Sequence, residues 1–570
     1  MIRFIRSTYA PFVLITVVAV LLCLPLIFHG FWPFSWDARL HINWATNFSR
    51  QFWSGEVYPR WLLDMNEGLG SPVFFYYPPT PYWITSLLAP LCGFDPLGWR
   101  PLAWSACLGL ALSGILSFLW LRLTIPNRPA LLASLLYMLL PYHLRTDLYV
   151  RGAFAEFWAF AWIPFVLYAV HRLAVTGWNG IPLIAFSYAL LITTHLPSTL
   201  VFSLVPLAYS LLIHPKGDRA VGLFRVVLGL TFGAGLGSIY LLPAMWMQGH
   251  VSMQELTADL YYAYSFFDAG SVPPLNVRTI VFKQEMFWIM LATVGTGATC
   301  SLLALQKGHA LRAQVLFWTA VMLLAWFMMF SGSNFIWQVF ERLQIIQFPW
   351  RFGTVVGIAA TALLALACSA LQRPLNWKQI VLLEGAYCGV VVWVFIFIAG
   401  IWPLHMQPFE SRSIALTSSV DAPEYRPRWV HTDREKVIRE FGNSTTTAPR
   451  VVFLNGTGTV HVLRWESRCI TLRIQTQTSC TIRVRRFYFA GWSASQPAVN
   501  VSPSFPEGLI QVSLPAGYHM VVLKLTPSAP ERLGATTSAC TVGTLLLFSV
   551  IGARRRWLAD SSQRRGAFPS

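Results

Sequence analysis

The chain has 570 residues, of which 55% are hydrophobic and only 12% are charged, and its mean hydropathy is +0.53. A soluble protein carries about twice that share of charge, so the composition excludes a soluble globular protein and predicts a polytopic α-helical membrane protein. The net charge of +18 does not indicate nucleic-acid binding, because the basic residues fall mostly in short gaps between apolar segments.

The first apolar segment covers residues 11–28 and follows Arg3 and Arg6, as at the start of a signal peptide. No small-residue cleavage site follows it, so we expect an uncleaved first span with a cytoplasmic N-terminus. Residues 82–94 are too short to span and predict a surface or re-entrant helix. Other apolar runs bring the expected count to about 12 spans; they cover 101–121, 130–146, 155–173, 180–195, 198–213, 221–243, 286–306, 313–331, 352–372, 379–402 and 536–552.

Basic residues support this count, because every second loop carries them, as cytoplasmic loops do. The residues concerned are Arg122, Arg128, Arg172, Lys216, Arg219, Lys307, Arg312, Arg373, Lys378, Arg554, Arg555, Arg556, Arg564 and Arg565. The pattern places both termini in the cytoplasm. It places residues 36–79, 244–285 and 403–535 on the outer face.

The first outer loop, within residues 30–100, is rich in ionisable and aromatic residues. Asp37 leaves the membrane beside Arg39 and His41, and a carboxylate at a membrane face is costly enough to suggest a function. The alternative is that these residues are ordinary interfacial charges. The same loop adds Arg60, Asp64 and Glu67.

Further polar residues fall at outer-face helix ends: Arg145, Arg151, Glu156, His195 and Arg351. Each alone has a structural alternative, namely a snorkelling arginine, a helix cap or an Arg151–Glu156 ion pair. Together with the first loop, they predict a site for an anionic, phosphate-bearing ligand.

Three regions follow from these patterns: a transmembrane module over 1–402, an outer-face domain over 403–535, and a last helix with a basic cytoplasmic tail over 536–570. Short alternating runs between turn residues predict a small antiparallel β-domain in the second region. Of nine cysteines, Cys469 and Cys480 lie in this domain, where a disulfide between them is plausible.

Motifs along nearly the whole chain resemble a bacterial family of multi-pass proteins labelled "6-pyruvoyl-tetrahydropterin synthase-related". This family looks like a branch of the GT-C membrane glycosyltransferases. The pterin label has no support in the sequence, which offers no zinc-binding histidine triad. The motifs are Asp37-Ala-Arg-Leu-His41, Gly55-Glu-Val-Tyr-Pro-Arg-Trp61, Gly68-Leu-Gly-Ser-Pro-Val-Phe-Phe-Tyr-Tyr-Pro-Pro79, Tyr149-Val-Arg-Gly-Ala-Phe-Ala-Glu156, Thr194-His-Leu-Pro-Ser198, Gln347-Phe-Pro-Trp-Arg-Phe352 and Leu514-Pro-Ala-Gly-Tyr-His519.

The resemblance implies a GT-C-like fold and transfer of a sugar from a polyprenyl-phosphate carrier to a glycan, lipid or protein acceptor. The reaction would take place on the outer face of the bacterial inner membrane, in the synthesis of a cell-envelope glycan. Asp37 matches the essential acidic residue of the first outer loop, which would take the proton from the acceptor hydroxyl. Residues expected to bind the donor phosphate or substrate are Arg60, Arg145, Arg151, Glu156, His195 and Arg351, with Arg39, His41, Asp64 and Glu67 as further candidates.

Position 39 is arginine, so this loop has no Asp-X-Asp pair, which favours a mechanism without a metal cofactor. It does not exclude Mg²⁺ or Mn²⁺ held with Asp64 or Glu156. One alternative function is a transporter or flippase for a lipid-linked or polyanionic substrate, which needs ionisable groups near the bilayer midplane. Glu384 is the main candidate for such a group. A third alternative is a non-enzymatic assembly factor whose β-domain binds a partner.

Overall fold

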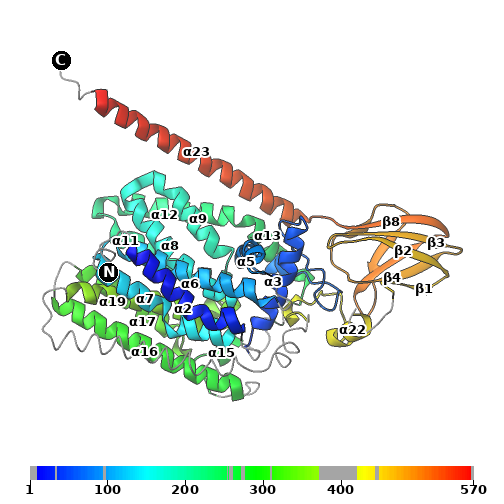
Figure 1. The fold of residues 1–570 in the computed structure, drawn as a ribbon, viewed down its shortest axis with the longest axis horizontal. Coiled ribbons are helices and arrows are strands. Elements are labelled where there is room, and N and C mark those ends of the chain that lie inside the picture. The colour runs from blue at the N-terminus through cyan, green and yellow to red at the C-terminus, as the bar shows by residue number, and fades with distance from the viewer. Residues whose placement is uncertain are drawn as a thin grey trace.

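The computed structural model describes residues 9–31, 35–93, 98–252, 255, 261–270, 277–307, 311–371, 420–442 and 449–565. A helical module is followed by a β-sandwich at one end of the molecule (Figure 1). The helix α2 begins, and α23 ends, on the side away from the sandwich. The main helical elements are α2 (Ala10–His29), α3 (Ala38–Trp53), α4 (Val73–Tyr76), α5 (Thr80–Leu88), α6 (Trp99–Leu121), α7 (Asn127–Met138), η2 (Tyr142–Arg151), α8 (Phe154–Thr176), α9 (Ile181–Ile192), α10 (Leu196–Phe202), α11 (Leu204–Ile213), α12 (Arg219–Leu236), α13 (Ser238–Trp246), α15 (Tyr261–Tyr264), α16 (Val277–Lys307), α17 (Arg312–Phe327), α18 (Asn334–Val339), η8 (Glu341–Ile346), η9 (Pro349–Phe352), α19 (Gly353–Ala370), η10 (Pro423–Tyr425), α22 (Arg434–Phe441) and α23 (Ala529–Arg565).

Within these described ranges, eight helical stretches are long and apolar enough to cross a membrane, or up to nine if the bent pair α17–α18 is one span. The chain is therefore a multi-pass membrane protein. The count of 12 spans stays a prediction, and the expected span at 379–402 lies outside the described residues.

The expected single span at 130–146 is wrong, because the helix breaks there. α7 ends at Met138, and Pro141 then precedes the wide, π-type helix η2. Proline lacks the N–H that would continue a helix, and its ring clashes with the carbonyl four residues before it. The polar side chains of His143, Thr146 and Asp147 on η2 are fully buried within the protein.

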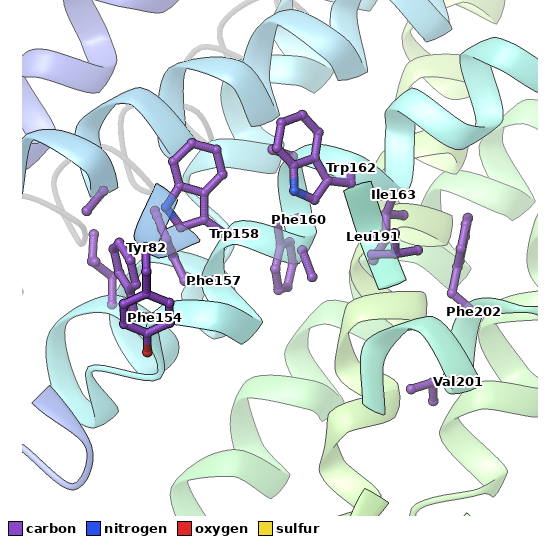
Figure 2. Packing of buried hydrophobic residues seen from close by; sticks show 14 of the residues in the cluster. Tyr82, Phe154, Phe157, Trp158, Phe160, Trp162, Ile163, Leu191, Val201 and Phe202 are labelled. Atoms are coloured by element: carbon purple, nitrogen blue, oxygen red, sulfur yellow. The ribbon is translucent and has the colours of Figure 1, made fainter. Parts of the chain in front are cut away.

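Aromatic residues of α8 form much of the core that surrounds the polar region. Figure 2 shows Phe157, Trp158, Phe160 and Trp162 along this helix, all of them buried. Gly109 of α6 lets that helix approach closely, since a methyl group there would lie 3.1 Å from the Trp158 ring. Tight packing of this kind gives α8 one fixed position.

The β-domain is a sandwich of two four-stranded antiparallel sheets, as the alternating pattern predicts. Their strand orders are β1-β4-β7-β6 and β2-β3-β8-β5. In β3, Ile470, Leu472 and Ile474 are buried while Arg473 and Gln475 are exposed. The strands are β1 (Val451–Asn455), β2 (Gly458–Trp465), β3 (Cys469–Thr476), β4 (Cys480–Phe487), β5 (Trp492–Ala494), β6 (Asn500–Pro503), β7 (Leu509–Leu514) and β8 (Gly517–Leu525).

The suggested disulfide between Cys469 and Cys480 is wrong. Both are free thiols, and they begin the consecutive strands β3 and β4. A strand rises about 3.3 Å per residue, so the length of β3 separates them by far more than the reach of a disulfide.

The sandwich rests on the first outer loop. The Phe487 N–H donates to the Leu69 carbonyl at 2.9 Å, and the rings of Trp61 and Phe489 lie 5.7 Å apart. Residues 420–425, which we expected to belong to the β-domain, instead pack against this loop through Asp421. This segment thus packs with the helical module.

Candidate active site

A cavity of about 340 Å³ lies between the first outer loop, η2, α8 and residues 345–351. Asp37, Arg151, Glu156, His195 and Arg351 all line it, together with His41. These residues come from separate segments of the chain, so the structure brings together most of the residues that we singled out from the sequence. Their roles in binding and catalysis stay predictions.

Arg151 is the centre of an ionic cluster at the C-terminal end of η2. Its Nη1 lies 2.9 Å from Glu156 Oε2 and 3.0 Å from Asp147 Oδ1, and its Nη2 lies 3.9 Å from Asp37 Oδ2. The Arg151 side chain is only 6% exposed. A buried guanidinium needs such carboxylate partners to offset its loss of hydration.

Glu156, at the N-terminal end of α8, is 1% exposed and accepts three hydrogen bonds. The donors are Arg151, Arg351 Nε at 3.2 Å, and the Tyr142 hydroxyl at 2.5 Å. One carboxylate therefore positions two guanidinium groups from distant segments.

Arg351 is held from the other side by the turn before η9. Its Nη1 donates to the Ile346 carbonyl at 2.6 Å and to Gln347 Oε1 at 3.3 Å. Its guanidinium carbon lies 5.1 Å from the Phe348 ring centroid. These contacts fix the planar group with one edge at the cavity.

Asp37 occupies the N-cap position of α3, and its backbone N–H donates to the Arg151 carbonyl at 2.8 Å. Gly152 makes this approach possible: its φ is +67°, and an added methyl group would lie 2.7 Å from the Ala38 Cβ. Of the Asp37 side chain, 37% is exposed, and it lines the cavity. Burial of this region raises the pKa of the carboxyl, although the nearby Arg151 and Arg351 lower it.

The two histidines of the cavity are neutral. Burial lowers the pKa of His41 and of His195 to about 3 in each case. His195 Nδ1 accepts the Ser198 N–H at 3.3 Å, which leaves Nε2 as the nitrogen that carries the proton. His41 Nδ1 lies 2.6 Å from the Tyr82 hydroxyl.

Arg60 and Arg145 do not line the cavity. Arg60 Nε lies 3.3 Å from Glu531 Oε1, and its Nη2 donates to the Ile239 carbonyl at 2.6 Å. Arg145 pairs with Glu285 at 3.1 Å. Both guanidinium groups therefore already have protein partners outside this cavity, and their role in binding the donor phosphate stays a prediction.

The further candidates Arg39, Asp64 and Glu67 also lie outside the cavity lining. Arg39 Nη1 donates to the Val420 carbonyl at 3.2 Å. Asp64 forms an exposed ion pair with Arg50 at 2.5 Å. Glu67 packs beside Gly442, where an added methyl group would lie 2.5 Å from the Glu67 Cβ.

Sequence reasoning missed several residues of this site. Tyr77 and Tyr425 line the cavity. Tyr77 belongs to an aromatic run that is equally typical of a membrane interface, and no sequence signal distinguished Tyr425. Asp147, which the sequence places among the polar residues near Arg151, does not line the cavity but pairs with Arg151 at 3.0 Å. Glu424 lies in the region assigned to the β-domain, and only the fold brings it to the cavity.

Metal dependence stays a prediction, and the two residues named for a bound metal do not lie together, because Glu156 lines the cavity and Asp64 does not. Asp64 is engaged by Arg50 away from the cavity, and the oxygens of Glu156 are taken by two arginines and a tyrosine. Among the described residues, no group of three or more His, Cys, Asp or Glu side chains is placed to hold a metal ion. Glu384, on which the transporter alternative rests, lies outside the described residues.

The fold and site define a multi-pass membrane protein with a charged cavity beside its first outer loop. No protein-family model matches the chain, and no curated protein matches it. The resemblance to the GT-C-related family therefore stays a prediction.

Among solved structures, similarity is found to the arabinofuranosyltransferase AftD from Mycobacteria. The TM-score is 0.43 with 16% identity, over 72% of this chain and 27% of that chain. For a mutant of AftD the TM-score is 0.45 with 13% identity, over 68% of this chain and 28% of that chain. A third similar structure is the oligosaccharyltransferase of Archaeoglobus fulgidus in complex with Zn and sulfate. Its TM-score is 0.32 with 14% identity, over 76% of this chain and 57% of that chain. The chain thus spans only part of these proteins, and likenesses this low define neither its fold nor its activity.

Proposed function

We propose that this protein is a membrane glycosyltransferase that moves a sugar from a polyprenyl-phosphate carrier to an acceptor hydroxyl on the outer face of the bacterial inner membrane. One observation carries the proposal: the Asp37 carboxylate opens into the same cavity as the buried guanidinium groups of Arg151 and Arg351. A base beside two fixed cations suits an attack by a hydroxyl group with departure of a phosphate.

In this reaction Asp37 accepts the proton of the acceptor hydroxyl as its oxygen attacks the anomeric carbon. The bond between that carbon and the phosphate oxygen breaks, and the electron pair leaves with the lipid phosphate. The raised pKa of Asp37 brings its basicity closer to neutral pH, which favours proton transfer.

Arg151 and Arg351 would stabilise the negative charge on the departing phosphate. Their forked donors match phosphate oxygens, and their burial strengthens the interaction. Glu156, which we expected to bind substrate, accepts hydrogen bonds from both arginines. Its role in the proposal is to hold the two cations in one orientation.

His195 supplies a neutral N–H donor at the same cavity. With its pKa near 3, it keeps this form across the physiological pH range. Such a donor binds a phosphate or sugar oxygen without adding charge.

The test is Asp37→Asn, which keeps the shape of the side chain and removes its basicity. We expect transfer to fall about 100- to 10,000-fold, the usual contribution of a general base. Mass spectrometry of envelope glycans from a gene-deleted strain complemented with each variant measures the product.

Asp64→Asn is the matched control, since Asp64 is an exposed carboxylate of the same loop. It should restore the wild-type glycan profile. A wild-type profile from Asp37→Asn, expressed at the wild-type level, would contradict the assignment of Asp37 as base.

A further inference from the structure

Residues 420–425 form a fixed wall of the cavity, and the anchor of this segment is Asp421. The Asp421 carboxylate accepts hydrogen bonds from Trp44 Nε1 at 2.9 Å and from the Ser71 hydroxyl. Its backbone N–H donates to Asn66 Oδ1 at 3.0 Å. Asp421 is 3% exposed, and buried charge-assisted bonds of this kind hold a segment rigidly.

Two arginines secure the same segment through its backbone. Arg39 Nη1 donates to the Val420 carbonyl at 3.2 Å, and Arg434 Nη1 donates to the Ala422 carbonyl at 2.9 Å. The Tyr425 ring packs 5.9 Å from Trp44 and 6.3 Å from Tyr76. The segment is therefore positioned by the first outer loop and by α22.

This anchoring brings Glu424 to the cavity that Asp37 lines. The pKa of the Glu424 carboxyl is raised to about 7, mainly by burial and also by the negative charges of Asp421 and Asp37, while a backbone hydrogen bond and Arg434 oppose the rise. The nearby Asp37 carboxylate therefore contributes to the raised pKa of Glu424. At neutral pH Glu424 is thus present in both protonation states and both accepts and donates hydrogen bonds.

We propose that Glu424 is a second substrate-binding carboxyl of the cavity, which hydrogen-bonds a hydroxyl group of the acceptor and directs the attacking oxygen toward Asp37. This inference rests on the proposed function. It assigns Glu424 to the acceptor and not to the donor phosphate, because Glu424 is itself a carboxyl that is partly charged at neutral pH, whereas the phosphate is proposed to bind at the guanidinium groups of Arg151 and Arg351. A neutral acceptor hydroxyl suits this part of the cavity.

The test uses the full-length protein in lipid nanodiscs. The donors are a panel of undecaprenyl phosphates carrying arabinose, glucose, mannose or galactose, and the acceptor is the envelope lipid and glycan extract of a gene-deleted strain. Initial rates are measured while the donor and the acceptor extract are varied in turn, for wild type, Glu424→Gln and Glu424→Ala.

For Glu424→Ala we expect the acceptor KM to rise about five- to tenfold, as for the loss of one hydrogen bond, with the donor KM unchanged. The wild-type acceptor KM should change across pH 7, where Glu424 titrates in the field of Asp421, Asp37 and Arg434. Glu424→Gln should abolish that pH dependence, an effect that a purely structural role would not produce.

Glu440→Gln is the matched control, because this glutamate lies exposed on α22, close in sequence. It should leave both KM values and the pH profile as in wild type. An unchanged acceptor KM in Glu424→Ala, or an equal rise in both KM values, would overturn the assignment of Glu424. Absence of product from the wild type with the whole panel would instead contradict the proposed glycosyl transfer, so the two failures are distinguishable.

Discussion

At the scale of single residues, the geometry of the site depends on which acceptor each guanidinium nitrogen of an arginine contacts. Arg351 uses Nε for Glu156 and Nη1 for the Ile346 carbonyl and Gln347. Lysine carries the same charge but presents it as a single point on a flexible stem, so it cannot reproduce these contacts.

We therefore expect Arg351→Lys to raise the donor KM about tenfold, the effect of about 1.4 kcal/mol of lost binding, and to leave the acceptor KM unchanged. Steady-state kinetics with each substrate varied will measure both values. An equal loss for donor and acceptor would show that Arg351 is structural and does not bind the phosphate.

At the scale of secondary-structure elements, the contact between η2 and α3 places Asp37, the proposed base, beside Arg151. The hydrogen bond from the Asp37 backbone N–H to the Arg151 carbonyl can form because Gly152 adopts a φ of +67° and packs closely against Ala38. A side chain at this position would both strain the backbone and push the start of α3 away from η2.

Gly152→Ala should lower the free energy of unfolding by about 2–4 kcal/mol, the sum of left-handed backbone strain and overpacking. It should also lower kcat, because Asp37 moves away from Arg151. Thermal unfolding in detergent and initial rates measure the two effects. Gly217→Ala, where no described atom lies within 4 Å of the added methyl group, is the control and should change neither. A Gly152→Ala protein with wild-type stability would contradict the close approach.

At the scale of the whole molecule, Glu531 joins three parts of the chain. It pairs with Arg60 of the first outer loop at 3.3 Å and with Arg468 of the sandwich at 2.7 Å, and it belongs to α23. Its side chain is 8% exposed and that of Arg60 is 7% exposed. This cluster fixes the sandwich over the loop that carries Asp37.

Glu531→Ala should destabilise the protein by about 3–5 kcal/mol, because it leaves the Arg60 guanidinium buried without its carboxylate. Asp64→Ala breaks an exposed pair instead and should cost under about 1 kcal/mol. Denaturant titration gives both values, and limited proteolysis reports whether the sandwich detaches. Equal stability of the two variants would show that Glu531 does not anchor the sandwich.

Much of this architecture could be predicted from the sequence, because the causes are local. Lipid requires long apolar helices, and alternating side chains define strands. Charged side chains are unfavourable in a membrane, so charged and polar residues at helix ends could be singled out from the sequence as a group. This group includes Asp37, Arg151, Glu156, His195 and Arg351.

The tertiary structure alone decided which charges meet. Arg60 and Arg145 resembled Arg151 in the sequence, yet each pairs with a carboxylate outside the cavity. Glu424 is far in the sequence from the other residues of the site. It reaches the cavity because Asp421 binds Trp44 and Ser71. Such partners depend on packing between distant segments, whereas composition and periodicity record only the surroundings of each segment by itself.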